Sequence, residues 1–261
     1  MPESLRAALR DRVVVADGAM GTMLQAGNPT LDDFQLHEGC NEVLNVTRAD
    51  LVRSVHDAYL SAGVDCIETN TFGANLANLG EYGIADRIAE LAGAAARIAR
   101  QAADDASTPD RPRYVLGAVG PGTKLPSLGH VSYAELLAAY RTQVEAMLAE
   151  GVDAVLVETA QDLLQAKAAV AAARAAIDTA GRDVVLIAQV TVETTGTMLL
   201  GSEIGAALTA LEPLGVDLVG LNCATGPEEM SEHLRHLSRH AEVGLSCMPN
   251  AGLPVLTSQG A

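Results

Sequence analysis

Short apolar runs alternate along the chain with longer stretches in which apolar residues recur at helical spacing. Within the runs, apolar residues are nearly continuous, which is typical of strands buried on both faces of a parallel sheet. The seven runs begin near Val13, Val64, Tyr114, Ala154, Val184, Leu218 and Val243. The pattern therefore predicts an α/β protein with a parallel sheet.

Amphipathic helices are predicted between these runs, at residues 51–59, 136–148 and 163–174 among others. Three predicted helices lead into a glycine followed by Val-Asp. These segments are Gly63-Val64-Asp65, Gly151-Val152-Asp153 and Gly215-Val216-Asp217. Glycine just past a helix end accepts the left-handed conformation that closes the helix. A recurring strand–turn–helix unit of this kind predicts a (β/α)8 TIM barrel with right-handed crossovers.

The number of predicted strands is one short of a closed barrel, because the last run ends near Asn250. A seven-stranded open barrel would leave strand edges unpaired. We therefore expect a TIM barrel truncated before its eighth strand. Residues 1–261 are predicted to form a single barrel domain that is a fragment of a longer multidomain chain.

Composition narrows the possible partners and the cellular compartment. The chain is 49% hydrophobic but only 3% aromatic, so we expect a large aliphatic core. A net charge of −16 argues against nucleic acid and anionic membranes as partners. No signal peptide is recognisable, and no apolar stretch reaches the roughly 18 residues of a membrane span. Four cysteines do not make a disulfide framework in a chain of this size, so a cytoplasmic protein is predicted.

Polar side chains gather where the predicted strands end. Asp17 follows the first run, Glu158 ends the fourth, and Cys223 ends the sixth. In a barrel these positions surround one mouth. The two carboxylates suit an ammonium group, the glycine-rich turns offer N–H groups to a carboxylate, and a thiolate suits zinc. A small zwitterionic substrate is therefore predicted, although Asp17 also fits a simple turn or helix N-cap residue.

The other three cysteines are predicted to be structural. Cys66 lies inside an apolar run, where a thiol most often serves packing. Cys40 and Cys247 carry no surrounding pattern that indicates chemistry.

Six motifs occur in the order in which they occur in the homocysteine S-methyltransferase family, and the chain resembles that family from about residue 10 to residue 255. They are residues 17–22 (DGAMGT), 69–75 (TNTFGAN), 120–121 (GP), 158–159 (ET), 220–227 (GLNCATGP) and 249–254 (PNAGLP). Residues 192–201 are especially similar to actinobacterial forms. Within the family, the resemblance is strongest to the N-terminal homocysteine-binding module of cobalamin-dependent methionine synthases.

This resemblance implies a zinc-dependent methyltransferase that converts homocysteine to methionine. The methyl donor would be methylcobalamin on another domain, with cobalamin- and methyltetrahydrofolate-binding domains of the same parent chain as partners. By the resemblance, Asp17 and Glu158 bind the amino group of the substrate, and Gly18 is a further substrate-binding residue. The Thr71-Phe72 turn then binds the carboxylate.

The resemblance also implies two zinc ligands in this chain. Cys223 is one, and Asn250 occupies the open zinc position until homocysteine displaces it. The family's other two ligands are adjacent cysteines in a Gly-Gly-Cys-Cys-Gly motif on the eighth strand, and this motif does not occur in the 261 residues.

We therefore expect weak or no zinc binding and no turnover from this chain by itself. Two alternatives stay open. One is a stand-alone homocysteine methyltransferase that uses S-methylmethionine or betaine. The other is a non-catalytic, amino-acid-binding barrel.

Overall fold

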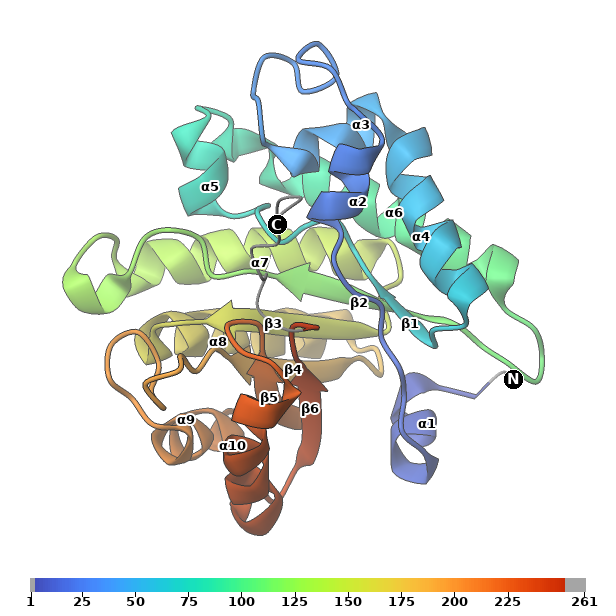
Figure 1. Cartoon of the computed structure of the whole chain (residues 1–261). Coiled ribbons are helices and arrows are strands. Elements are labelled where there is room, and N and C mark those ends of the chain that lie inside the picture. The colour runs from blue at the N-terminus through green and yellow to red at the C-terminus, as the bar shows by residue number, and fades with distance from the viewer. Residues whose placement is uncertain (1–2, 252–261) are drawn as a thin grey trace, which may run out of the picture.

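The computed structural model describes residues 3–251, and its centre is a curled sheet of six parallel strands (Figure 1). The strands lie side by side in the order of the chain, because a helical connection returns each one to the same end of the sheet. They are β1 (Cys66–Glu68), β2 (Tyr114–Val119), β3 (Ala154–Ala160), β4 (Val185–Val190), β5 (Leu218–Asn222) and β6 (Gly244–Met248). The predicted α/β class with a parallel sheet is confirmed.

Helices cover the outer face of the sheet (Figure 1). The longer ones are α4 (Ala49–Ala62), α6 (Ile88–Ala106), α7 (Tyr133–Ala149), α8 (Leu163–Ala180), α9 (Ile204–Leu211) and α10 (Pro227–His240). Shorter ones are α1 (Leu5–Asp11), α2 (Gly21–Ala26), α3 (Leu44–Thr47) and α5 (Leu76–Glu81), with 3-10 turns η1 (Asn41–Val43), η2 (Ala85–Arg87), η3 (Pro126–Leu128) and η4 (Glu212–Leu214). Between residues 3 and 251 no helix has both the length and the apolar character to cross a membrane.

The core is aliphatic, as the composition predicts. Alanines on α6 and α8, such as Ala96, Ala99 and Ala172, are fully buried and let these helices approach the strands closely. The three predicted helices lie within α4, α7 and α8. The predicted left-handed glycines Gly63 and Gly215 have φ of 105° and 80°.

The first predicted strand does not form a regular strand, so that prediction is wrong. Residues from Val13 onward stay extended and join the sheet through one parallel bridge between Ala16 and Cys66. Val13 is 85% exposed and Val15 is 53% exposed. The physical reason is short pairing, because within residues 3–251 the backbone of this segment bonds to the sheet only at Asp65 and Cys66.

The three Val-Asp pairs share a role at the N-terminal ends of the strands. The three aspartates precede β1, β3 and β5, that is, every second strand. The Oδ2 of each accepts a hydrogen bond from a backbone N–H of the preceding extended segment of the sheet. The pairs are Asp65 with Val15 at 2.9 Å, Asp153 with Val115 at 2.8 Å, and Asp217 with Leu186 at 2.8 Å. Each also pairs with an arginine, namely Arg12, Arg100 and Arg6 in turn. The repeated motif thus fastens neighbouring strands together.

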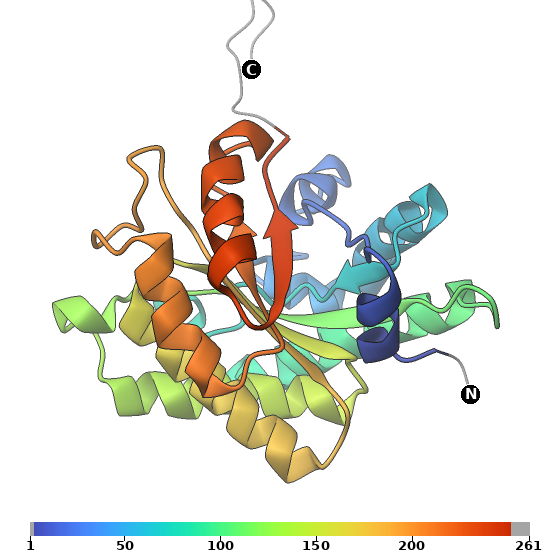
Figure 2. The same cartoon turned by 90° about the horizontal axis from the view of Figure 1, so that it is seen from below.

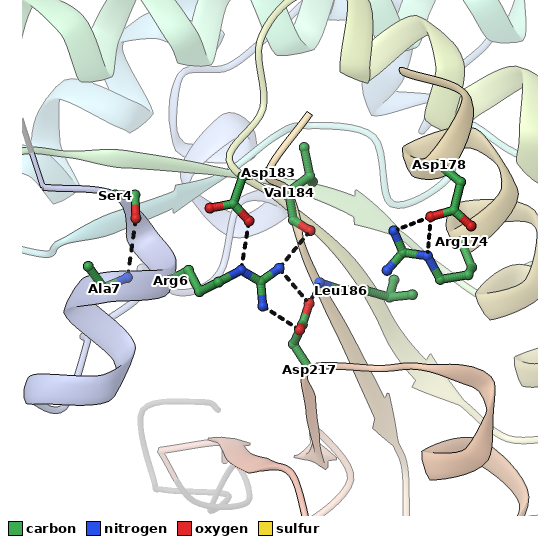
Figure 3. A network of polar contacts seen from close by, with 9 residues as sticks. All are labelled: Ser4, Arg6, Ala7, Arg174, Asp178, Asp183, Val184, Leu186 and Asp217. Atoms are coloured by element: carbon green, nitrogen blue, oxygen red, sulfur yellow. Dashed lines mark hydrogen bonds and ion pairs between the residues drawn. The ribbon is translucent and has the colours of Figure 1, made fainter. Parts of the chain in front are cut away.

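Helix α1 lies apart from the outer helix layer, against the N-terminal ends of the strands (Figure 2). Leu5 and Ala8 are buried against the inner face of the sheet. Arg6 donates from Nε to Asp183 at 2.7 Å, from both terminal nitrogens to Asp217, and to the carbonyl of Val184 at 3.3 Å (Figure 3). Helix α1 therefore covers this end of the curled sheet and leaves the C-terminal strand ends for the site.

Candidate active site

A cavity of about 1360 Å³ lies inside the curled sheet. Six of the seven predicted site residues line it, namely Asp17, Gly18, Phe72, Glu158, Cys223 and Asn250. The seventh, Thr71, is fully buried behind the cavity wall. The structure thus brings together residues that are far apart in the sequence, the most distant being Asp17 and Asn250, 233 positions apart.

Asp17 is fixed by the backbone of the neighbouring strand. Its two carboxylate oxygens accept hydrogen bonds from the Glu68 N–H, at 3.1 and 3.0 Å. The following helix, α2, has Met20 at its N-cap with no side-chain cap bond. The N-cap alternative for Asp17 is therefore excluded, and its carboxylate is directed to the cavity end of β1.

A third carboxyl group, Glu68, lines the cavity with Asp17 and Glu158. Burial raises the pKa of Asp17 to about 8, and repulsion from Glu158 adds to this. Burial likewise raises the pKa of Glu158 to about 7 and that of Glu68 well above its usual range. Within residues 3–251 none of the three forms an ion pair with Lys or Arg. The group is therefore partly protonated near neutral pH and favours a cation.

Sequence reasoning missed Glu68, although a signal was available. It is the last residue of β1. Because side chains two positions apart in a strand point to the same face, Glu68 points to the inner face of the sheet, as Cys66 does. The rule that selected Asp17 and Glu158, a carboxylate at a strand end, applies to it equally.

Asn222 connects the carboxyl groups to the thiol. Its Nδ2 donates to Glu158 Oε2 at 3.2 Å, to Thr159 Oγ1 at 2.7 Å and toward Cys223 Sγ at 3.3 Å. Its Oδ1 accepts from the Thr159 N–H at 2.7 Å. Asn222 is only 2% exposed, and a buried amide needs such partners. The sequence prediction did not include Asn222, because its partners Thr159 and Glu158 lie 63 and 64 positions away.

Cys223 has an unusual backbone conformation. Cys223, Ala224 and Thr159 have φ of 56°, 54° and 56°, in the left-handed region that non-glycine residues rarely adopt. Such strain persists only where neighbouring contacts enforce it, and it is concentrated at functional sites. Here the Cys223 N–H donates to the Met248 carbonyl at 3.1 Å. Burial raises the pKa of the Cys223 thiol, so without a metal it is protonated at neutral pH.

The described residues do not complete a zinc site. Within residues 3–251 no group of three or more His, Cys, Asp or Glu side chains is arranged to hold a metal ion. Cys223 offers one sulfur, and the Asn250 N–H is bonded to the Thr225 carbonyl at 3.1 Å. Cys247 instead faces Met230 of α10, with 3.9 Å between the sulfur atoms. Cys40 and Cys66 are buried, and all four cysteines are free thiols.

The Thr71-Phe72 turn reaches the cavity through Phe72 alone. The Thr71 hydroxyl donates to the Ala118 carbonyl at 2.6 Å, and Gln143 Nε2 donates to the Thr71 carbonyl at 2.9 Å. These contacts hold the Thr71 side chain in the core. Phe72 is 41% exposed and lines the cavity.

Comparison with known proteins identifies the family. The model of the family described as "Homocysteine S-methyltransferase" matches residues 14–260. The chain belongs to the homocysteine S-methyltransferase family. The resemblance seen in the sequence is thereby confirmed.

Two curated relatives are similar over nearly the whole chain. They are the methionine synthases of Mycobacterium tuberculosis (strain ATCC 25618 / H37Rv), 64% identical, and of Mycobacterium leprae (strain TN), 62% identical, each over 253 residues. Both matches cover 97% of this chain and 21% of the relative, so the chain spans about a fifth of their length.

A solved homologue extends the comparison to the fold. The metallated form of the Escherichia coli homocysteine methyltransferase MmuM is 26% identical, with a TM-score of 0.78. The match covers 95% of this chain and 87% of that one. The barrel-type fold predicted from the strand pattern is thus shared with an enzyme of the same family.

Proposed function

We propose that this chain binds homocysteine and presents its thiol for methylation to methionine. The observation that supports this best is the cavity that the three carboxyl groups and Cys223 line together, in a member of this family. The carboxyl groups suit an ammonium group, and the sulfur marks the end where a substrate thiol would lie.

In this proposal the chain's own residues bind and orient the substrate. Asp17 and Glu158, with the Gly18 turn, hold the amino group, and the Phe72 backbone holds the carboxylate. An ammonium ion stabilises the ionised carboxylates and therefore lowers their raised pKa values. Holding both charged groups of the amino acid fixes the direction of its thiol, and orientation of this kind makes a large contribution to group transfer.

The proposal includes zinc only through its candidate ligands, Cys223 and Asn250. A tetrahedral zinc site takes four ligands, and those two leave it incomplete. We therefore propose that this chain binds zinc weakly and does not catalyse methyl transfer by itself. In the same proposal residues 1–261 are the homocysteine-binding domain of a longer cytoplasmic protein, with methylcobalamin as donor and with cobalamin- and methyltetrahydrofolate-binding domains as partners.

Two rival functions differ in what supports them. A stand-alone enzyme using S-methylmethionine or betaine is disfavoured, because the chain is 64% identical to a methionine synthase and 26% identical to MmuM. A non-catalytic amino-acid-binding barrel stays an alternative, because Cys223 and Asn250 alone leave a tetrahedral zinc site incomplete.

Calorimetric titration with homocysteine tests the proposal. The chain should bind homocysteine without added zinc, and the double variant Asp17→Asn/Glu158→Gln should bind it at least about tenfold more weakly, since charge-assisted hydrogen bonds are lost. Glu203→Gln is the control, because it removes an exposed carboxylate that makes no cap bond at the start of α9. Equal affinity of the double variant and the wild type would contradict the proposed site.

Metal analysis and an activity assay test the proposal that this chain binds zinc weakly and does not catalyse methyl transfer by itself. Mass spectrometry of the chain under native conditions should show far less than one zinc per molecule, and no methionine should form from homocysteine and methylcobalamin. Stoichiometric zinc or sustained methyl transfer would show that the ligand assignment is wrong.

A further inference from the structure

A buried carboxylate outside the predicted site supports the turn that carries Phe72. Glu42, in η1, is 7% exposed and lines the cavity wall. Its Oε1 accepts a hydrogen bond from the Gly73 N–H at 2.7 Å, and the Cys40 thiol faces its Oε2 at 3.7 Å. Glu42 therefore contacts the residue directly after Phe72.

The same turn is held at its other end by three asparagines. Asn70 Nδ2 donates to the Asn41 carbonyl at 2.8 Å and to Asn45 Oδ1 at 2.9 Å. Asn45 Nδ2 donates back to the Asn70 carbonyl at 2.9 Å. On the far side, a Cβ on Gly120 would lie 2.4 Å from the Phe72 carbonyl oxygen, so only glycine fits there. The turn is thus fixed from both sides, with Glu42 as its one carboxylate contact.

The backbone N–H of Phe72 differs from those of the residues around it in the second half of the turn. The N–H groups of Thr71, Gly73, Ala74 and Asn75 bond to Thr69, Glu42, Thr71 and Gly73. The Phe72 N–H has no acceptor among residues 3–251. Phe72 is 41% exposed and lines the cavity, so its N–H is available to an acceptor oxygen of a ligand bound there.

We propose that Glu42 is a positioning residue that holds the Phe72 N–H toward the substrate carboxylate and so makes the site select amino acids over simple amines. This inference rests on the proposed homocysteine function and deepens it. Without the Glu42 acceptor the Gly73 N–H would be buried and unsatisfied, so the peptide plane would rotate to find another partner. The adjacent Phe72 N–H would then lose its direction.

The chemistry of Glu42 fits a position close to an anionic ligand. Burial raises the pKa of Glu42, which reduces its repulsion of a bound carboxylate. Neutral or ionised, one of its oxygens remains an acceptor for the Gly73 N–H. A glutamine side chain offers that acceptor too, so Glu42→Gln is the conservative variant.

The test compares homocysteine with 3-aminopropanethiol, which is homocysteine without its carboxylate. Calorimetry should show that Glu42→Ala weakens homocysteine binding about tenfold and leaves the amine nearly unchanged, as expected for loss of one charge-assisted hydrogen bond. Glu42→Gln should retain the wild-type preference within about twofold.

Asp162→Ala is the matched control. Asp162 is also a buried carboxylate, but it braces a different loop, where it accepts from Ser127 at 2.9 Å (N–H) and 2.7 Å (hydroxyl). Its loss should lower stability without changing the preference for homocysteine over the amine.

The outcomes distinguish failure of the proposed homocysteine function from failure of the proposed role of Glu42. If the wild type does not bind homocysteine, the proposed function itself fails. If the wild type binds homocysteine but Glu42→Ala weakens both ligands equally, or neither, Glu42 has only a structural role. Should Glu42→Ala not fold, Glu42→Asp retracts the carboxylate by one methylene and should show the same selective loss.

Discussion

The two ends of the curled sheet differ in whether their carboxylates have arginine partners. At the N-terminal end Asp65 is paired with Arg12 and with the Val15 N–H; burial alone would raise its pKa, but these contacts lower it. At the C-terminal end burial raises the pKa of Asp17 and Glu158, and no Lys or Arg among the described residues pairs with them. The first end maintains the fold, while the second keeps its charges available for a ligand.

Loss of a paired carboxylate at the N-terminal end should have the largest effect on stability. Asp217→Ala leaves the Leu186 N–H and Arg6 without their partner, and we expect the free energy of unfolding to fall by roughly 3 kcal/mol. Asp183→Ala removes the more exposed partner of the same arginine and should cost less than about 1 kcal/mol (Figure 3). Urea denaturation checks both values, and equal losses would contradict the special role of the Val-Asp motif.

At the C-terminal end, the free energy of unfolding should fall as pH rises, whereas a salt-bridged carboxylate makes it rise with pH. The pKa of Glu158 is raised to about 7 in the folded state, so the folded protein binds the extra proton. The stabilisation by this proton is complete at pH values below the pKa of Glu158 in the unfolded chain. It is lost as pH rises through the pKa of Glu158 in the folded protein. Between pH 5 and 8 we expect a loss of roughly 2 kcal/mol.

The variant Glu158→Gln should flatten this pH dependence while weakening homocysteine binding. Denaturation curves at several pH values provide the measurement. An unchanged slope in the variant would mean that Glu158 does not titrate in this range.

The smallest expected effect concerns backbone strain. Cys223→Gly relieves a left-handed conformation, with φ of 56°, and should stabilise the protein by about 1 kcal/mol while removing the thiol. Gly215→Ala, with φ of 80°, imposes the same strain at the other end and should destabilise by a similar amount. Thermal melts of the two variants check the signs. A destabilised Cys223→Gly variant would show that the Cys223 side-chain contacts outweigh the strain.

Much of the fold could be predicted because each regular element carries its own periodic signal. The continuous apolar runs at β2 to β5 follow from strands that are covered on both faces. The run at Val13 has the same composition, yet it forms only one bridge. Composition reports the tendency to extend, whereas a regular strand also requires a ladder of several backbone contacts with a neighbour, such as β6 makes with β5.

The site was only partly predictable, because side-chain direction and partner choice are set by packing. Residues at strand ends, such as Asp17 and Glu158, were accessible to sequence reasoning. Thr71 was placed in the right turn, but its hydroxyl bonds to Ala118 behind the cavity wall. The roles of Glu42 and Asn222 depend on contacts with Gly73 and Glu158, 31 and 64 residues away, which no local pattern contains.

The Asp65, Asp153 and Asp217 contacts also divide the sheet into modules. Each aspartate side chain reaches back to the preceding segment, and its own carbonyl accepts from the next strand, at Tyr114, Val185 and Gly244. The repeat therefore has a period of two strands. In recombination between homologues, a crossover between two successive aspartates would leave both with their backbone partners only if it fell between Tyr114 and Val115, or between Val185 and Leu186.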